Sequence, residues 1–312
     1  MAHVHLWKLG NYYSGKEDRN GGNAEYNYIK KELESICKSM KVKFHENEMP
    51  TKDELNEKII VFVVNGLMQH DDIQRAEEYR EYADEMVYFL TDFGFADQNR
   101  AVAKVCDLVL HQSPYDKDFR LFDKPGFYSF VPEIFYDESI PKSDIKMDLC
   151  FFGGNQAGRE EEFSEYVVDE SGYPAMRIKN GIASFFKTAD GKDFRVSYEN
   201  YRRILSLFRF AFVSGRSAGK EAGWVTPRIV EAINAGCIPI LINDYDSTNY
   251  FGLKDYRVHS YKDLLQFMEE TNEADDQYLE TVVKRIKAGK HLFRIQIERI
   301  IKRPLQENKN NV

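Results

Sequence analysis

The sequence has few cysteines and no long apolar run, and each absence removes a class of protein. Its 312 residues include only four cysteines, at positions 37, 106, 150 and 237, with no CxxC pair among them. Scattered thiols in apolar settings predict reduced, buried side chains rather than a disulfide framework or a thiol metal site. No apolar stretch approaches the ~20 residues needed to cross a bilayer. We therefore expect a cytoplasmic protein with no membrane partner.

The first residues also lack the features of a secretory signal. The segment MAHVHLWKLG has no basic start, no long apolar stretch and no small-residue cleavage site. This agrees with a cytoplasmic location.

The chain has no overall excess of basic residues, but its basic residues are concentrated near the C-terminus. It carries 43 Lys and Arg against 51 Asp and Glu, a formal net charge of −8. Between positions 284 and 303 a single acid, Glu298, accompanies eight basic residues: Lys284, Arg285, Lys287, Lys290, Arg294, Arg299, Lys302 and Arg303. A basic segment of this kind suits a polyanion such as double-stranded DNA. Alternatively, the same residues pair with acidic groups of the first domain.

Segments with strand and helix patterns alternate along the chain. Apolar strands are predicted at 3–9, 42–45, 59–64, 86–91, 108–111, 128–135, 147–152, 173–179, 208–213, 237–242 and 256–259. Helical patterns are predicted at 23–39, 72–84, 98–105, 159–168, 197–208, 226–235, 262–270 and 274–302, the last with a bend at Gly289. This alternation predicts an α/β fold with parallel sheets and helices on both faces.

A polar stretch containing Pro141 separates two halves of similar layout. The segment DESIPKSDI, between positions 136 and 146, lacks hydrophobic periodicity and is typical of a linker. We expect domains over 1–140 and 147–285, followed by a C-terminal helix and tail over 286–312. A substrate would bind in the cleft between two such domains.

The most informative passage runs from Phe208 to Asp244. Its first strand ends in a loop that contains three glycines, Arg216 and Lys220, so the backbone can approach a ligand and the charges favour an anion. Thr226 can cap the helix that follows, and Arg228 falls in its first turn. A phosphate is held in this way outside the carboxyl ends of parallel strands. An ordinary βαβ unit with a solvated Arg228 is the alternative.

This passage resembles known donor-binding segments. FRFAFVSGR followed by PRIVEAINAGCIPILIND is similar to the segment of exostosin-type glycosyltransferases in which a phenylalanine-rich strand precedes R-x-x-E-A-L-x-x-G-C-I-P-V-I. GWVTPRIVEAI also resembles the G-Y-V-T-E-K segment of α1,3-fucosyltransferases. Both families have the GT-B architecture. The resemblance implies two facing Rossmann-like domains, with the acceptor side in the first, the nucleotide sugar in the second, and a C-terminal helix that crosses back.

The resemblance also implies roles for individual residues. Arg228 takes the place of the basic residue at the donor diphosphate, and Glu231 that of the acidic residue which accepts a ribose hydroxyl. Pro227 stands where the fucosyltransferase motif has glutamate, which disfavours a fucosyl donor. For Glu231 the alternative is a surface carboxylate. The remaining candidates for donor contact are Arg177, Arg216, Thr226, Gly22, Gly154 and Asp244; for Arg177 the alternative is an exposed strand-end arginine.

An inverting enzyme would need a general base from the first domain. Asp92, at a predicted strand end before Phe93-Gly94, is the first candidate, and Glu17 and Asp18 in the first long loop come next. Each of these carboxylates can instead serve a turn or a cap. A retaining enzyme would need no such base, and the sequence leaves the stereochemistry open.

Metal binding is not favoured by the sequence. Asp244 and Asp246 form a D-x-D pattern of the kind that binds a divalent ion, but short acidic matches are frequent by chance and this one follows the expected donor unit. His3, His5, His70 and His111 show no H-x-x-x-H or related spacing, so no zinc site is indicated. The expected ligand is the nucleotide-sugar donor, with no tightly bound cofactor.

The leading hypothesis is therefore a hexosyl- or pentosyltransferase that uses a nucleotide-diphosphate sugar, with UDP favoured. Compact GT-B enzymes of this size resemble the phage transferases that modify hydroxymethylcytosine in DNA, which makes 5-hydroxymethylcytosine the leading acceptor. A surface glycan as acceptor and a non-catalytic nucleotide-sugar-binding module are the alternatives.

Overall fold

The chain folds into two compact α/β units. The structure is a computed structural model. It describes residues 2–8, 24–54, 56–64, 70–91, 96–114, 125–140, 142–144, 146–152, 175–179, 182–184, 194–195, 198–213, 223–242, 250–253, 256–271 and 273–303. Of these, the first unit contains 2–8, those within 25–131, and 291–303, and the second contains 24 and those within 132–290.

The first unit is built on a parallel sheet of six strands in the order β2-β1-β3-β4-β5-β6. The strands are β1 (Ala2–Lys8), β2 (Lys43–Glu46), β3 (Lys58–Val64), β4 (Glu85–Leu90), β5 (Leu108–His111) and β6 (Gly126–Tyr128). The helices between them are α1 (Ala24–Met40), the 3₁₀ turn η3 (Lys52–Glu54), α2 (His70–Tyr82) and α3 (Ala96–Val105). The parallel arrangement predicted from the alternation of elements is confirmed.

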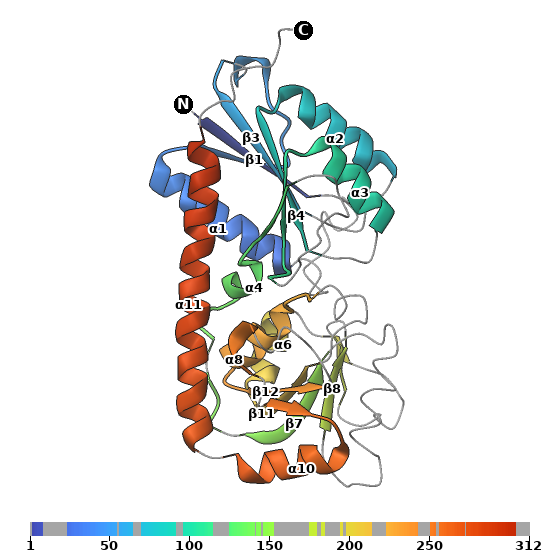
Figure 1. Ribbon diagram of the computed structural model, residues 1–312, viewed down its shortest axis with the longest axis vertical. Coiled ribbons are helices and arrows are strands. Elements are labelled where there is room, and N and C mark those ends of the chain that lie inside the picture. Colours follow the sequence, from blue (N-terminus) through green and yellow to red (C-terminus); the bar gives the residue numbers. More distant parts are fainter. Residues whose placement is uncertain are drawn as a thin grey trace. The chain divides into compact units, whose positions relative to one another are not determined.

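Helices cover both faces of this sheet, which explains its continuous apolar strands. Residues 59–64 of β3 are all buried, as expected for a central parallel strand. On one face the Tyr26 hydroxyl of α1 donates to Glu46 of β2, at 2.8 Å. On the other, Trp7 of β1 stacks on Tyr79 of α2, with ring centroids 4.9 Å apart. In Figure 1, α1 lies on one side of the strands and α2 and α3 on the other.

The last strand of the first half is shorter than predicted. The sequence suggested a strand over 128–135, but β6 ends at Tyr128 and the chain turns into a short helix, α4 (Val131–Ile134). Pro132 is the physical reason, because proline has no N–H for a strand ladder but fits the first turn of a helix.

The second unit holds a seven-stranded sheet in the order β10-β9-β8-β7-β11-β12-β13. Its strands are β7 (Met147–Phe152), β8 (Ala175–Lys179), β9 (Ile182–Ser184), β10 (Phe194–Arg195), β11 (Phe208–Val213), β12 (Ile238–Ile242) and β13 (Arg257–Val258). The sequence missed β9 and β10, which are too short to show a hydrophobic period and which pair antiparallel. The other five strands pair in parallel, as predicted. The helix predicted over 159–168 lies outside the described residues.

Aromatic side chains fill the core of the second unit. Phe151, Phe210 and Phe212 of the central strands β7 and β11 are fully buried. The described helices are α6 (Tyr198–Leu205), α8 (Pro227–Asn234) and α10 (Tyr261–Glu270). Figure 1 shows α6 and α8 on one side of β11 and β12 and α10 on the other. All four cysteines of the chain are buried and outside any disulfide, as expected.

The final helix, α11 (Glu273–Lys302), supplies residues to both units. It is drawn in red in Figure 1 and runs through Gly289 without interruption. A Cβ atom at position 289 would lie 2.7 Å from Cγ of Glu133, so the glycine allows close packing and does not break the helix. Among the described helices, none is long and apolar enough to cross a membrane.

Candidate functional site

The helix start at Thr226 has the local structure that the sequence predicted. Thr226 is extended (φ −77°, ψ 131°), and its hydroxyl accepts a hydrogen bond from the Arg228 N–H at 3.4 Å. Its carbonyl accepts from the Ile229 N–H at 3.3 Å, and Pro227 has no N–H to offer. The first turn of α8 therefore has few unpaired amides. An anion at this end would be attracted by the Arg228 guanidinium and the helix dipole.

The strands on either side of α8 place this helix start at the carboxyl edge of the second sheet. β11 pairs with β12 in parallel, from Phe210 opposite Ile238 to Val213 opposite Leu241. A parallel crossover begins its helix beyond the end of the first strand, which here is Val213. Arg228, half-buried in the first helical turn, therefore stands where ligands bind in open α/β sheets.

Glu231 lies one turn further along α8 and is held by two tyrosines of α6. The Tyr198 hydroxyl donates to Oε1 of Glu231, and the Tyr201 hydroxyl lies 3.4 Å from Oε2. Burial raises the pKa of Glu231, while the Tyr198 hydrogen bond and the Arg228 charge act in the opposite direction. The Glu231 carboxylate is therefore held in place by protein contacts and is not a solvated surface group.

A second set of contacts fixes α6 beneath the site. Arg202 forms an ion pair with Asp137 at 3.2 Å, and its guanidinium lies over the Tyr198 ring, 5.3 Å from the centroid. The Asp137 N–H donates to the Asn234 side chain of α8 at 3.0 Å. These contacts tie α6 to α8, so the two tyrosine hydroxyls are aimed at Glu231. Sequence reasoning missed Tyr198 and Tyr201, although their i, i+3 spacing places both on one helix face.

Of the predicted site residues, the structure brings Thr226, Arg228 and Glu231 together. Arg177 belongs to β8, where it pairs in register with Phe151 and Ser184, but its side chain is not among those described. The other predicted residues lie outside the described part of the chain: Asp92, Asp18, Glu17, Arg216, Gly22, Gly154 and Asp244. β4 nevertheless ends at Leu90, two residues before the position of Asp92.

Buried polar side chains gather at the carboxyl edge of the first sheet. His111 ends β5, and its Nδ1 accepts a hydrogen bond from the Ser113 N–H at 3.3 Å. Gln112 is fully buried, and its two amide atoms have no hydrogen-bond partner within the described residues. The Ser129 N–H donates to the His111 carbonyl at 2.7 Å. Sequence reasoning did not single out Gln112 as a candidate, since one glutamine after a strand gives no pattern.

His111 predicts a loss of stability in acid. Burial lowers its pKa from 6.5 to about 4, so it stays neutral when folded. Between about pH 6.5 and pH 4 the unfolded chain binds a proton that the folded chain does not, and stability falls as pH falls, by up to about 3 kcal/mol. His111→Gln should flatten this part of the pH dependence of the free energy of unfolding, measured by urea denaturation. The exposed-site control His259→Gln should leave the slope as in the parent protein.

The basic segment at 284–303 is largely engaged by the protein itself. Arg294 pairs with Glu32 at 3.0 Å, Arg303 with Glu85 at 3.0 Å, and Lys287 with Glu138. Three more basic side chains contact oxygens of the protein. Arg285 contacts the Phe251 carbonyl, Lys290 the Tyr136 carbonyl, and Lys302 the Glu298 carboxylate. Six of the eight basic side chains are therefore used within the chain. Three of these partners, Glu32, Glu85 and Glu138, are acidic residues of the predicted first domain, which is the alternative raised by the sequence.

Comparison with known proteins gives structural likenesses only. No protein-family model matches the sequence, and no curated protein matches it. The β-glucosyltransferase of phage T4, described as a DNA modifying enzyme, aligns with a TM-score of 0.64 over 96% of this chain and 100% of its own, at 13% identity. Its complex with UDP-glucose gives a TM-score of 0.64 at 14% identity, with the same coverage.

A second type of enzyme gives a partial alignment. An α,α-trehalose-phosphate synthase (UDP-forming) from Burkholderia vietnamiensis aligns with a TM-score of 0.51 over 78% of this chain and 74% of its own, at 10% identity. The chain has the GT-B fold. This confirms the fold expected from the donor-segment resemblance. In GT-B terms, the β11–α8–β12 unit occupies the second domain, where that resemblance placed the donor.

Proposed function

We propose that the protein is a glycosyltransferase that moves a sugar from a nucleotide-diphosphate sugar, with UDP as the nucleotide, to an acceptor hydroxyl. The observation that carries this proposal is the position of Arg228. It lies in the first turn of α8, at the carboxyl edge of a parallel sheet, in a chain with the GT-B fold.

Arg228 suits the leaving group of this reaction. When the bond between the sugar and the diphosphate breaks, negative charge builds up on the diphosphate oxygens. A fixed guanidinium beside a helix N-terminus stabilises that charge without reorganising at the moment of reaction. Thr226 holds the turn that presents Arg228. Arg177 and Arg216 are proposed as further cations at the diphosphate, and Gly22 and Gly154 as points of close backbone approach.

Glu231 suits the ribose of the donor. Each oxygen of an ionised carboxylate has two acceptor positions, so accepting from Tyr198 and Tyr201 leaves room for ribose hydroxyls. The two tyrosines also fix the direction in which the remaining positions point. Asp244 is proposed to lie near the transferred sugar.

The proposed acceptor is 5-hydroxymethylcytosine in DNA. The support is the alignment with the T4 enzyme, which is described as DNA modifying. That alignment covers the whole of the T4 chain. In a duplex the target base would have to flip out of the stack to reach the reacting centre. Asp92, with Asp18 and Glu17 as alternatives, is proposed to take the proton from the attacking hydroxyl. The segment 284–303 gives this acceptor little support, because six of its eight basic groups are engaged.

A transfer assay tests the donor and the acceptor together. The protein is incubated with a panel of nucleotide sugars and with DNA containing hydroxymethylcytosine, unmodified DNA or oligosaccharides, and the products are analysed by mass spectrometry. A hexose-sized or pentose-sized increment on hydroxymethylcytosine nucleosides alone supports the proposal. An increment only on oligosaccharides moves the acceptor to glycans. Binding of a nucleotide sugar without any transfer would make the protein a binding module.

A further inference from the structure

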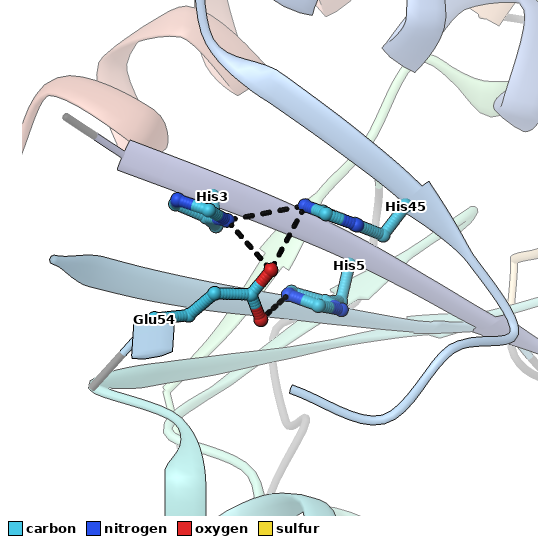
Figure 2. A group of neighbouring side chains, drawn as sticks. All are labelled: His3, His5, His45 and Glu54. Atoms are coloured by element: carbon cyan, nitrogen blue, oxygen red, sulfur yellow. Dashed lines mark hydrogen bonds and ion pairs between the residues drawn. The ribbon is translucent and has the colours of Figure 1, made fainter. Parts of the chain in front are cut away.

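Three histidines and a glutamate converge in the first unit, at the end of the sheet opposite the carboxyl edge. His3 and His5 are two residues apart on β1, so their side chains point to the same face of the sheet. His45 of the neighbouring strand β2 is paired in register with His5. The turn η3 brings Glu54 onto that face. Figure 2 shows the three rings and the carboxylate turned toward one another. We call these four residues the histidine cluster.

The cluster has the dimensions of a tetrahedral metal site. Nδ1 of His3 lies 3.1 Å from Nε2 of His45 and 3.1 Å from Oε1 of Glu54. Oε1 lies 3.5 Å from Nε2 of His45, and Oε2 lies 3.5 Å from Nε2 of His5. One ligand atom from each residue falls within 4.8 Å of all the others. Zinc bonds of about 2.0–2.1 Å in a tetrahedron place ligand atoms about 3.3–3.4 Å apart.

The outer nitrogen of each ring faces an acceptor. Nδ1 of His5 lies 3.0 Å from the Glu48 carbonyl, Nδ1 of His45 lies 3.4 Å from the Glu48 carboxylate, and Nε2 of His3 lies 3.4 Å from the Glu57 carboxylate. A neutral imidazole has one N–H, and the Glu48 contacts place it on the outer nitrogen of His5 and of His45. The inner nitrogens of these two rings then carry lone pairs, whereas His3 makes its hydrogen bonds within the cluster through Nδ1, and its Nε2 has no hydrogen-bond partner among the described residues. The Glu48 contacts are of the kind that orients histidine ligands around a metal.

Without a cation, the inner side of the cluster is only partly satisfied, by hydrogen bonds between Nδ1 of His3 and both Nε2 of His45 and Oε1 of Glu54. Nε2 of His5 is buried with no hydrogen-bond partner, and the His5 residue is only 1% exposed. Glu54 is oriented independently, because its Oε2 accepts from the Thr51 N–H at 2.8 Å. The polar atoms are therefore aimed at a common point that no described group of the protein occupies.

We propose that the first unit binds a structural Zn²⁺ ion through three imidazoles and one carboxylate: His3, His5, His45 and Glu54. Imidazole with carboxylate in a tetrahedral arrangement favours zinc over Cu²⁺ and Ni²⁺, which prefer tetragonal geometry. Four protein ligands leave no open position for a reacting water, so the ion is structural. It would join the edge strand β2 and the turn η3 to β1. The proposal is independent of sugar transfer.

The experiment uses the untagged full chain after treatment with a chelator. We expect the protein to take up one Zn²⁺ per chain by elemental analysis and to show a higher melting temperature with zinc than without. Co²⁺ should give the visible absorption of a tetrahedral site. Isothermal titration should show that His45→Ala and Glu54→Gln each weaken zinc binding at least about 100-fold, and Glu57→Gln about 10-fold. His291→Ala, an exposed histidine on α11, is the matched control and should bind as the parent does.

Two results would overturn the proposal. One is a parent protein that takes up no zinc, or that binds only Cu²⁺ or Ni²⁺. The other is zinc binding of unchanged affinity in both His45→Ala and Glu54→Gln. If these variants fail to fold, the comparison of the parent with and without zinc decides alone. Sugar transfer is not the readout, so failure here leaves the proposed function standing.

Discussion

Arg228→Ala is expected to lower the turnover number of sugar transfer by about 100- to 1,000-fold, the usual loss when one group that stabilises developing negative charge is removed. The side chain is half-buried in the first turn of α8, and the Thr226 cap bonds to its backbone rather than its guanidinium. Alanine is also a good helix former. The fold should therefore survive while the diphosphate loses its cation.

Two further variants make this prediction specific. Arg228→Lys keeps the positive charge but loses the planar fork of donors, so it should recover only part of the rate. Arg203→Ala removes an exposed arginine of α6 that pairs with Glu199, and it should leave turnover unchanged. Initial rates at saturating nucleotide sugar, with circular dichroism to check folding, separate these outcomes. Normal turnover in Arg228→Ala would show that the donor diphosphate does not bind at Arg228.

Phe293→Ala should destabilise the first unit by about 3–5 kcal/mol, the usual cost of deleting a buried phenylalanine ring. Phe293 lies on α11 and is fully buried, with its ring stacked on Phe89 of β4 at 6.1 Å. Phe89 in turn stacks on Phe62 of β3 at 5.7 Å. The second half of α11 is therefore part of the core of the first unit, and the alanine would leave a cavity there.

The two tryptophans allow the stability of the two units to be measured separately. Trp7 belongs to the first unit and Trp224 to the second, and both are buried. In a Trp224→Phe background, Trp7 fluorescence reports unfolding of the first unit in urea. Leu292→Ala, next to Phe293 but 44% exposed, should change the free energy of unfolding by no more than about 0.5 kcal/mol. Equal effects of the two substitutions would contradict the packing of α11.

Most strands and helices could be predicted because their signals are local. The run of apolar residues in β3, the Thr226 cap with Pro227, and the alternation of strands and helices are each readable within a few residues. The prediction over 128–135 was wrong where Pro132 competes with an apolar run. β9 and β10 were missed because strands of three and two residues depend on their partner strands rather than on their own pattern.

The candidate site divides in the same way. Arg228 was found from the helix start in one segment, and Glu231 from the resemblance of that segment to known donor-binding segments. Their surroundings were not predictable, because Tyr198 and Tyr201 are about 30 residues away and meet Glu231 only once α6 packs on α8. The basic segment 284–303 shows the same limit, because the sequence gives the charges but not their partners.

By itself, the sequence determined the α/β class, the two-part layout and the capped helix that presents Arg228. These depend on periodicity and on hydrogen bonds within a turn, which neighbouring residues settle. Only the tertiary structure decided that Glu231 is held by tyrosines, that most charges of α11 are used internally, and that His45 and Glu54 meet the first strand. Apart from the Lys302–Glu298 pair, those contacts join residues from 30 to 262 positions apart, so they depend on how strands and helices pack and not on any local pattern.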